Sequence, residues 1–71
     1  MKWAVVCKLD QTYAYLSVEY GPSTVVHAQA LLFDTEQEAE RVRVVRHYDW
    51  LEPVEDEREF RSREDTWDVG D

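Results

Sequence analysis

The chain has 71 residues, and its sixteen acidic residues outnumber its eight lysines and arginines, so that its formal net charge is −8. A chain of this length forms a single domain with a small hydrophobic core. The lone Cys7 excludes an intramolecular disulfide, and His27 and His47 lack the paired spacing of zinc ligands. We therefore expect a protein without a disulfide, a metal or a cofactor.

Three β-strands are predicted in the first half of the chain, at residues 3–9, 13–20 and 24–33, because these segments are rich in β-forming residues and alternate in polarity. Turn signals at residues 10–12 and 21–23 separate them. Connections this short favour an antiparallel meander. In the first strand, alternation divides the side chains between two faces, with Trp3, Val5, Cys7 and Leu9 on one and Ala4, Val6 and Lys8 on the other.

A helix is predicted to begin after Asp34, because Thr35 and Glu38 have the spacing of a capping box. Acidic residues precede arginines in this segment, which is the order that the helix dipole favours. The alternative is a strand at residues 42–48, because the sequence Arg-Val-Arg-Val at residues 41–44 alternates as a strand does.

A short strand is predicted at residues 50–54, where the apolar periodicity ends. We therefore expect a sheet–helix core at residues 1–54 and an acidic C-terminal extension at residues 55–71. The extension is either a disordered tail or a short helix with Pro53 in its first turn. The predicted fold class is α+β, with a small antiparallel sheet of three strands, or four with the short one, one helix on a face, and the acidic extension.

Negative charge is concentrated in the last third of the chain. Residues 49–71 hold ten carboxylates and three arginines, whereas residues 1–33 are neutral. This asymmetry indicates a basic partner. Phe60 and Trp67 lie among these charges, where an aromatic ring either anchors a partner or packs back onto the sheet. The predicted partner-binding residues are Asp49, Glu52, Glu55, Asp56, Glu57, Glu59, Phe60, Glu64, Asp65 and Trp67.

The sequence contains no motif for catalysis. It has two glycines, Gly21 and Gly70, and lacks a glycine-rich phosphate loop, a nucleophile elbow and a His–Glu metal motif. A small core is a poor place for a water-excluding active site, so we predict no catalytic residue and no enzymatic activity. The acidic excess disfavours direct binding to nucleic acid. Met1 leads into a strand, and no export signal or membrane span is present, so we expect a complete cytoplasmic protein.

Residues 30–39, with the sequence Ala-Leu-Leu-Phe-Asp-Thr-Glu-Gln-Glu-Ala, resemble a pattern in small phage and prophage proteins. The host-RNA-polymerase inhibitors of T7-like phages have a similar layout, in which a Thr-x-x-Glu-Ala helix start is followed by a tryptophan. This similarity covers residues 30–54. The acidic C-terminus resembles in style the phage inhibitors that mimic DNA, including some anti-CRISPR proteins. The resemblance implies a phage protein that inhibits a host protein, and it assigns no role to any residue.

The sequence thus predicts a non-enzymatic inhibitor whose acidic surface occupies a basic, nucleic-acid-binding groove of a host polymerase, nuclease or CRISPR effector. Charge complementarity would speed the encounter, and aromatic side chains would supply specificity. The alternative is a structural or assembly module that self-associates as a homo-oligomer through a sheet edge, with the acidic tail keeping it in solution.

Overall fold

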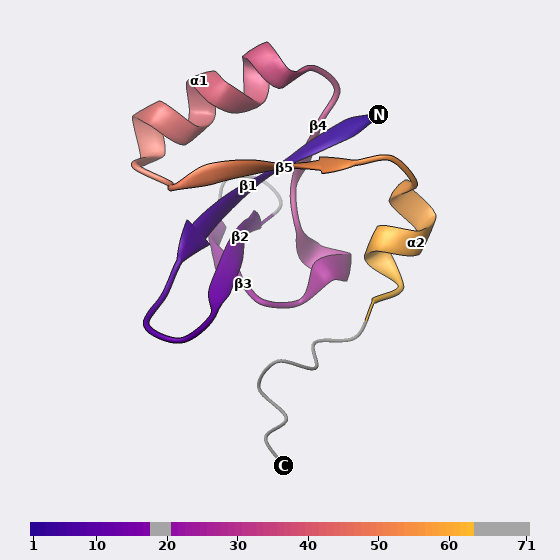
Figure 1. Cartoon of the computed structure of the whole chain (residues 1–71), viewed down its shortest axis with the longest axis horizontal. Coiled ribbons are helices and arrows are strands. Elements are labelled where there is room, and N and C mark those ends of the chain that lie inside the picture. Colours follow the sequence, from indigo (N-terminus) through magenta and orange to yellow (C-terminus); the bar gives the residue numbers. More distant parts are fainter. Residues whose placement is uncertain (18–20, 64–71) are drawn as a thin grey trace.

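The computed structural model describes residues 1–17 and 21–63. It confirms the predicted α+β class, with a small antiparallel sheet and one main helix, and the sheet has five strands. In chain order, the elements are β1 (Lys2–Lys8), β2 (Tyr13–Ser17), β3 (Gly21–Thr24), the short 3-10 helix η2 (His27–Gln29), β4 (Leu32–Phe33), α1 (Glu36–Arg46), β5 (Trp50–Val54) and α2 (Glu57–Arg61) (Figure 1).

Strand β1 is the centre of the sheet. Along one edge it pairs with β5, from Lys2 opposite Val54 to Val6 opposite Trp50. Its other edge is shared by β2 and β4, and β3 pairs with β2. All of these pairings are antiparallel. A strand that is enclosed on both faces needs a continuous apolar run, which is what the middle of β1 provides.

The hydrophobic core has two parts, one on each face of the sheet, because successive side chains of β1 point in opposite directions. Val5 belongs to the part beneath α1, and Ala4 and Val6 belong to the part beneath α2. The α1 side consists of Val5, Leu16, Phe33 and Ala39, and the α2 side of Ala4, Val6, Tyr15, Ala30, Val54 and Phe60. The predicted division of β1 into two faces is therefore confirmed.

Helix α1 begins where the capping signal predicts. The Thr35 hydroxyl accepts a hydrogen bond from the Glu38 backbone amide at 3.1 Å. The helix ends at His47, which has the left-handed angles φ 63° and ψ 40°, and the Tyr48 amide bonds back to the Arg43 carbonyl at 2.9 Å. The alternative of a strand at residues 42–48 is wrong, because the capped helix continues through Arg46 and packs on the sheet.

The predicted third strand at residues 24–33 is wrong, since the structure divides this segment into the end of β3, η2 and β4. The turn expected at residues 21–23 lies within β3 itself. Local hydrogen bonds break the strand: the Thr24 hydroxyl accepts from the Val26 amide at 3.0 Å, and the Gln29 amide donates to the Val26 carbonyl at 3.0 Å. These bonds compete with a sheet ladder and allow His27 to turn into the core.

The buried part of the chain extends past the boundary expected at residue 54. Phe60, on α2, is only 1% exposed and belongs to the core on that face. Pro53 lies in β5 rather than at the start of a helix, and Asp56 caps α2 instead. Of the two interpretations of the extension, a short helix is therefore observed at Glu57–Arg61, while residues 64–71 lie outside the described part.

Candidate partner-binding surface

Helix α2 and its N-cap hold three of the eight acidic side chains that the sequence singled out. The Asp56 carboxylate accepts from the Glu59 amide at 3.2 Å and so fixes the start of the helix. Glu57 pairs with Arg61 at 3.0 Å, one turn later. Glu55 and Glu59 are exposed, and neither side chain has a hydrogen bond or ion pair with another described residue. Their charges are therefore available to a partner.

A groove of about 220 Å³ runs between β5 and α2. Its walls combine buried apolar side chains with three carboxylates and one guanidinium. The Arg63 guanidinium lies 5.4 Å from the centre of the Phe60 ring and 3.4 Å from Glu52 Oε2. A groove of this kind suits a cationic side chain, because carboxylates form charge-assisted hydrogen bonds with it. The lining residues are Pro53, Val54, Glu55, Asp56, Glu59, Phe60 and Arg63.

Phe60, expected as an anchor on a partner, instead lies in the core. Its ring packs edge to face against Tyr15, with 5.3 Å between ring centres, and lies 4.9 Å from the ring of His27. The alternative of packing back onto the sheet is therefore what the structure shows. A ring that is already enclosed by its own chain has no free face for a partner.

Two further acids of the predicted set make contacts within the fold. Glu52 Oε1 accepts a hydrogen bond from the Tyr15 hydroxyl at 2.7 Å. Asp49 Oδ2 accepts from the Lys8 backbone amide at 2.6 Å, at the end of β1. Both carboxylates thus stabilise the sheet as well as contributing negative charge. The predicted contact residues Glu64, Asp65 and Trp67 lie outside the described residues.

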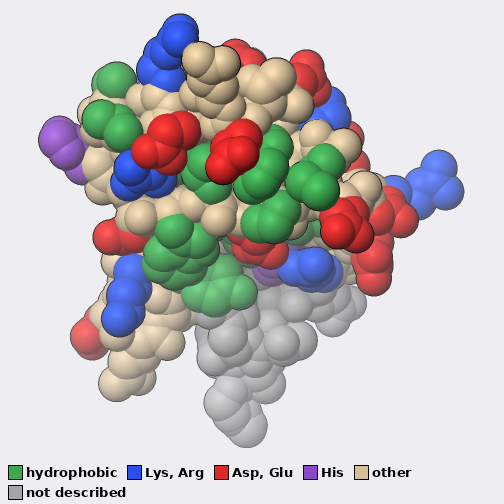
Figure 2. Space-filling model, turned by 45° about the horizontal axis from the view of Figure 1, so that its top comes forward, with side chains coloured by type: hydrophobic (Ala, Val, Ile, Leu, Met, Phe, Trp, Pro, Cys, Tyr) green, Lys and Arg blue, Asp and Glu red, His purple; other side chains and the backbone are tan. Residues whose placement is uncertain are grey.

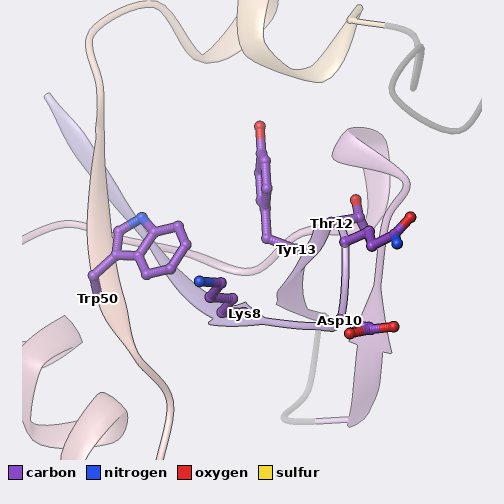
Figure 3. Close-up of a pocket in the computed structure, with 6 residues that line it drawn as sticks. Lys8, Asp10, Thr12, Tyr13 and Trp50 are labelled. Atoms are coloured by element: carbon purple, nitrogen blue, oxygen red, sulfur yellow. The ribbon is translucent and has the colours of Figure 1, made fainter.

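A second cleft, of about 530 Å³, was not anticipated from the sequence (Figure 3). Trp50 and Lys8 come to it from the paired strands β5 and β1, and Tyr13 from the start of β2. The Trp50 side chain is 41% exposed. The sequence signal was the alternation of residues 50–54, which places Trp50 on the same face as Glu52. The cleft is lined by Lys8, Asp10, Gln11, Thr12, Tyr13 and Trp50.

The surroundings of Cys7 and His27 fit a structural role for both side chains. Burial, with the nearby Asp49 carboxylate, raises the pKa of the Cys7 thiol, which makes it a poorer nucleophile at neutral pH. His27 is 5% exposed, and its Nε2 lies 3.3 Å from the Tyr15 hydroxyl.

Within residues 1–17 and 21–63, no group of three or more His, Cys, Asp or Glu side chains could hold a metal ion. In the same ranges, no helix is long and apolar enough to cross a membrane.

Comparison with protein-family models, with curated proteins and with solved structures found no match for this chain. The resemblance to small phage inhibitors therefore stays a prediction.

Proposed function

We propose that this protein is a non-enzymatic, cytoplasmic inhibitor that binds a basic host protein in the groove where that protein normally holds nucleic acid. The candidate hosts are a polymerase, a nuclease or a CRISPR effector. The observation that carries the proposal is the pair of exposed carboxylates, Glu55 and Glu59, that flank one groove on a chain of net charge −8.

The arginines near these carboxylates support the proposal because two of them turn toward the protein itself. Arg61 Nη1 donates to the carbonyls of Ala28 and Ala30 at 3.0 and 2.9 Å. Arg63 lies against Glu52 and Phe60. The charges that face outward from this end of the molecule are therefore weighted toward carboxylates. Outward carboxylates attract a basic surface at long range and are screened by salt.

The test begins with capture of the partner from host cells by the tagged full chain, followed by competition with nucleic acid. We expect the protein to displace nucleic acid from the captured partner. Simultaneous binding of both would contradict the proposal. The variant Glu55→Gln/Glu59→Gln should weaken binding roughly tenfold at low salt and much less at high salt, because it removes two exposed charges that no other described residue pairs with.

The matched control is Glu36→Gln/Glu38→Gln, which removes two exposed carboxylates from α1 on the other side of the sheet. The control should bind as wild type does, provided that both variants retain their melting temperatures. If the control weakens binding as much as the groove variant, only the net charge matters, and the groove has no special role.

A self-associating module is the second candidate, and one observation favours it. Val44 and Val45 on α1 are 55% and 69% exposed, which leaves an apolar pair on the outer side of that helix. β5 pairs with β1 alone among the described strands and so has a free edge, but Pro53 interrupts the amide donors along it, which argues against association through that edge. Sedimentation at several concentrations separates the two candidates, because only the module gains mass as concentration rises.

A further inference from the structure

We propose that the cleft at Trp50 and Tyr13 binds an arginine side chain of the partner. This inference rests on the proposed function, because it names a side chain that the basic partner inserts in addition to its contact with the acidic groove. In Figure 3, the Trp50 ring and the Tyr13 ring stand on opposite sides of the Lys8 side chain, and Asp10 lies beyond Lys8 on the side away from Trp50. Figure 2 shows hydrophobic side chains gathered in the middle of one face, with acidic side chains on several sides.

The two rings form an open corner rather than a sandwich. Their centres are 6.1 Å apart and their planes are tilted by 53°. A flat group between two parallel rings needs about 7 Å, since each stacked layer takes roughly 3.5 Å. The guanidinium therefore does not enter between the rings but stacks on the exposed face of Trp50, where 41% of that side chain is accessible. Arginine suits this geometry better than lysine, because its planar cation stacks on aromatic faces and is weakly hydrated.

The rings are held in place before a ligand arrives. Tyr13 packs edge to face on Tyr15 with 5.8 Å between ring centres. Tyr15 is fully buried, and its hydroxyl is hydrogen-bonded to Glu52 on β5. A rigid aromatic surface loses little conformational entropy on binding, so more of the contact energy appears as affinity.

The charges around the cleft favour a cation. Lys8 supplies one positive charge, whereas Asp10 lies in the lining, Asp49 bonds to the Lys8 amide, and Glu52 follows Trp50 by two residues on the same face of β5. The lining and the residues next to it on the chain thus carry three carboxylates and one ammonium group. The Thr12 hydroxyl oxygen in the same lining is buried and has no hydrogen-bond partner within residues 1–17 and 21–63.

The experiment is an NMR titration of the ¹⁵N-labelled full chain with the tripeptide acetyl-Gly-Arg-Gly-amide at low salt. The probes acetyl-Gly-Lys-Gly-amide and AMP serve as comparisons. We expect a saturable shift of the Trp50 indole N–H, with the arginine peptide bound roughly threefold more tightly than the lysine peptide. Equal binding of the two peptides, or stronger binding of AMP, would overturn the assignment of an arginine site.

Two variants check the site. Trp50→Leu should abolish the saturable response of the remaining cleft signals, and Asp10→Asn should weaken it while keeping both rings. Asp10→Asn also keeps the test valid if Trp50→Leu perturbs folding. Shifts confined to the Glu55 and Glu59 amides would overturn the cleft inference and leave the proposed function intact. Loss of competition with nucleic acid in the partner assay would refute the proposed function, whereas a Trp50 response would still establish a guanidinium site.

Discussion

The hydroxyl of Tyr15 donates a hydrogen bond to Glu52 Oε1 at 2.7 Å and so links β2 to β5 across the intervening strand β1. Because this proton is committed to Glu52, the 3.3 Å contact with His27 Nε2 is a hydrogen bond only if His27 carries its proton on Nε2. The ring of Phe60 covers the same group from α2. Three distant segments of the chain are therefore joined around one buried tyrosine.

This arrangement predicts a specific response to alkaline pH. Burial raises the pKa of Tyr15 well above its usual value, and the bond to Glu52 raises it further. Unfolded Tyr15 loses its proton near pH 10, whereas folded Tyr15 keeps it. The folded state therefore binds more protons above that pH, and stability should fall as pH rises. Absorbance at 295 nm should show that one of the four tyrosines ionises only when the protein unfolds.

Tyr15→Phe is the matched control for this alkaline response. It keeps the buried ring and removes the hydroxyl, so its stability should fall less steeply above pH 10 than that of wild type. If all the tyrosines of the wild-type protein ionise before the unfolding transition, Tyr15 is not protected as the structure indicates.

The burial of Phe60 predicts that α2 is part of the folding unit. Phe60→Ala should lower the free energy of unfolding by about 3–5 kcal/mol, as for other buried aromatic side chains, because it leaves a cavity against Tyr15 and His27. Removal of residues 55–71 should be at least as damaging, whereas removal of residues 64–71 keeps Phe60 and should cost far less. Urea denaturation of the three proteins measures this, and a stable chain ending at residue 54 would contradict it.

Arg61 should stabilise the protein through hydrogen bonds rather than through charge. Its Nη1 donates to the carbonyls of Ala28 and Ala30, which tie α2 to the segment around η2. Arg61→Met should cost about 1–3 kcal/mol, because it leaves these acceptors without their donor. Arg58→Met changes the charge equally from an exposed position on the same helix and should have little effect. Equal melting temperatures for the two variants would show that the carbonyl contacts do not matter.

His47 offers a stabilising substitution. Its φ of 63° is in the left-handed region, where a residue with a Cβ atom is strained. His47→Gly should raise the free energy of unfolding by about 1 kcal/mol, because glycine is the preferred residue at this position after a helix. Thermal melting checks this against His47→Ala, which keeps the Cβ atom and should show no gain. A lower melting temperature for the glycine variant would mean that the imidazole makes a contact of greater value.

Features set by neighbours in the sequence were predictable. The Thr35 cap acts on an amide three residues away, and the alternation of Ala4, Val5 and Val6 follows from strand geometry alone. These two signals predicted the α+β class and the start of α1, whereas residues 42–48 were left open between a helix and a strand. A short strand was also predicted at residues 50–54 and is observed there as β5.

Only the tertiary structure decided the rest, because the deciding contacts join residues far apart in the chain. Tyr15 and Glu52 are 37 residues apart, and no local pattern indicates that their side chains meet. The burial of Phe60 depends on that same meeting, since Tyr15 and His27 form the surface against which it packs. Residues 24–33 form a broken segment rather than one strand because η2 turns His27 beneath α2. The corner between Trp50 and Tyr13 exists because β1 pairs with β2 on one edge and with β5 on the other. These pairings place the two ring side chains on the same face of the sheet. Sequence composition determined that the protein is acidic, and the packing of distant strands determined which acidic and aromatic side chains face outward.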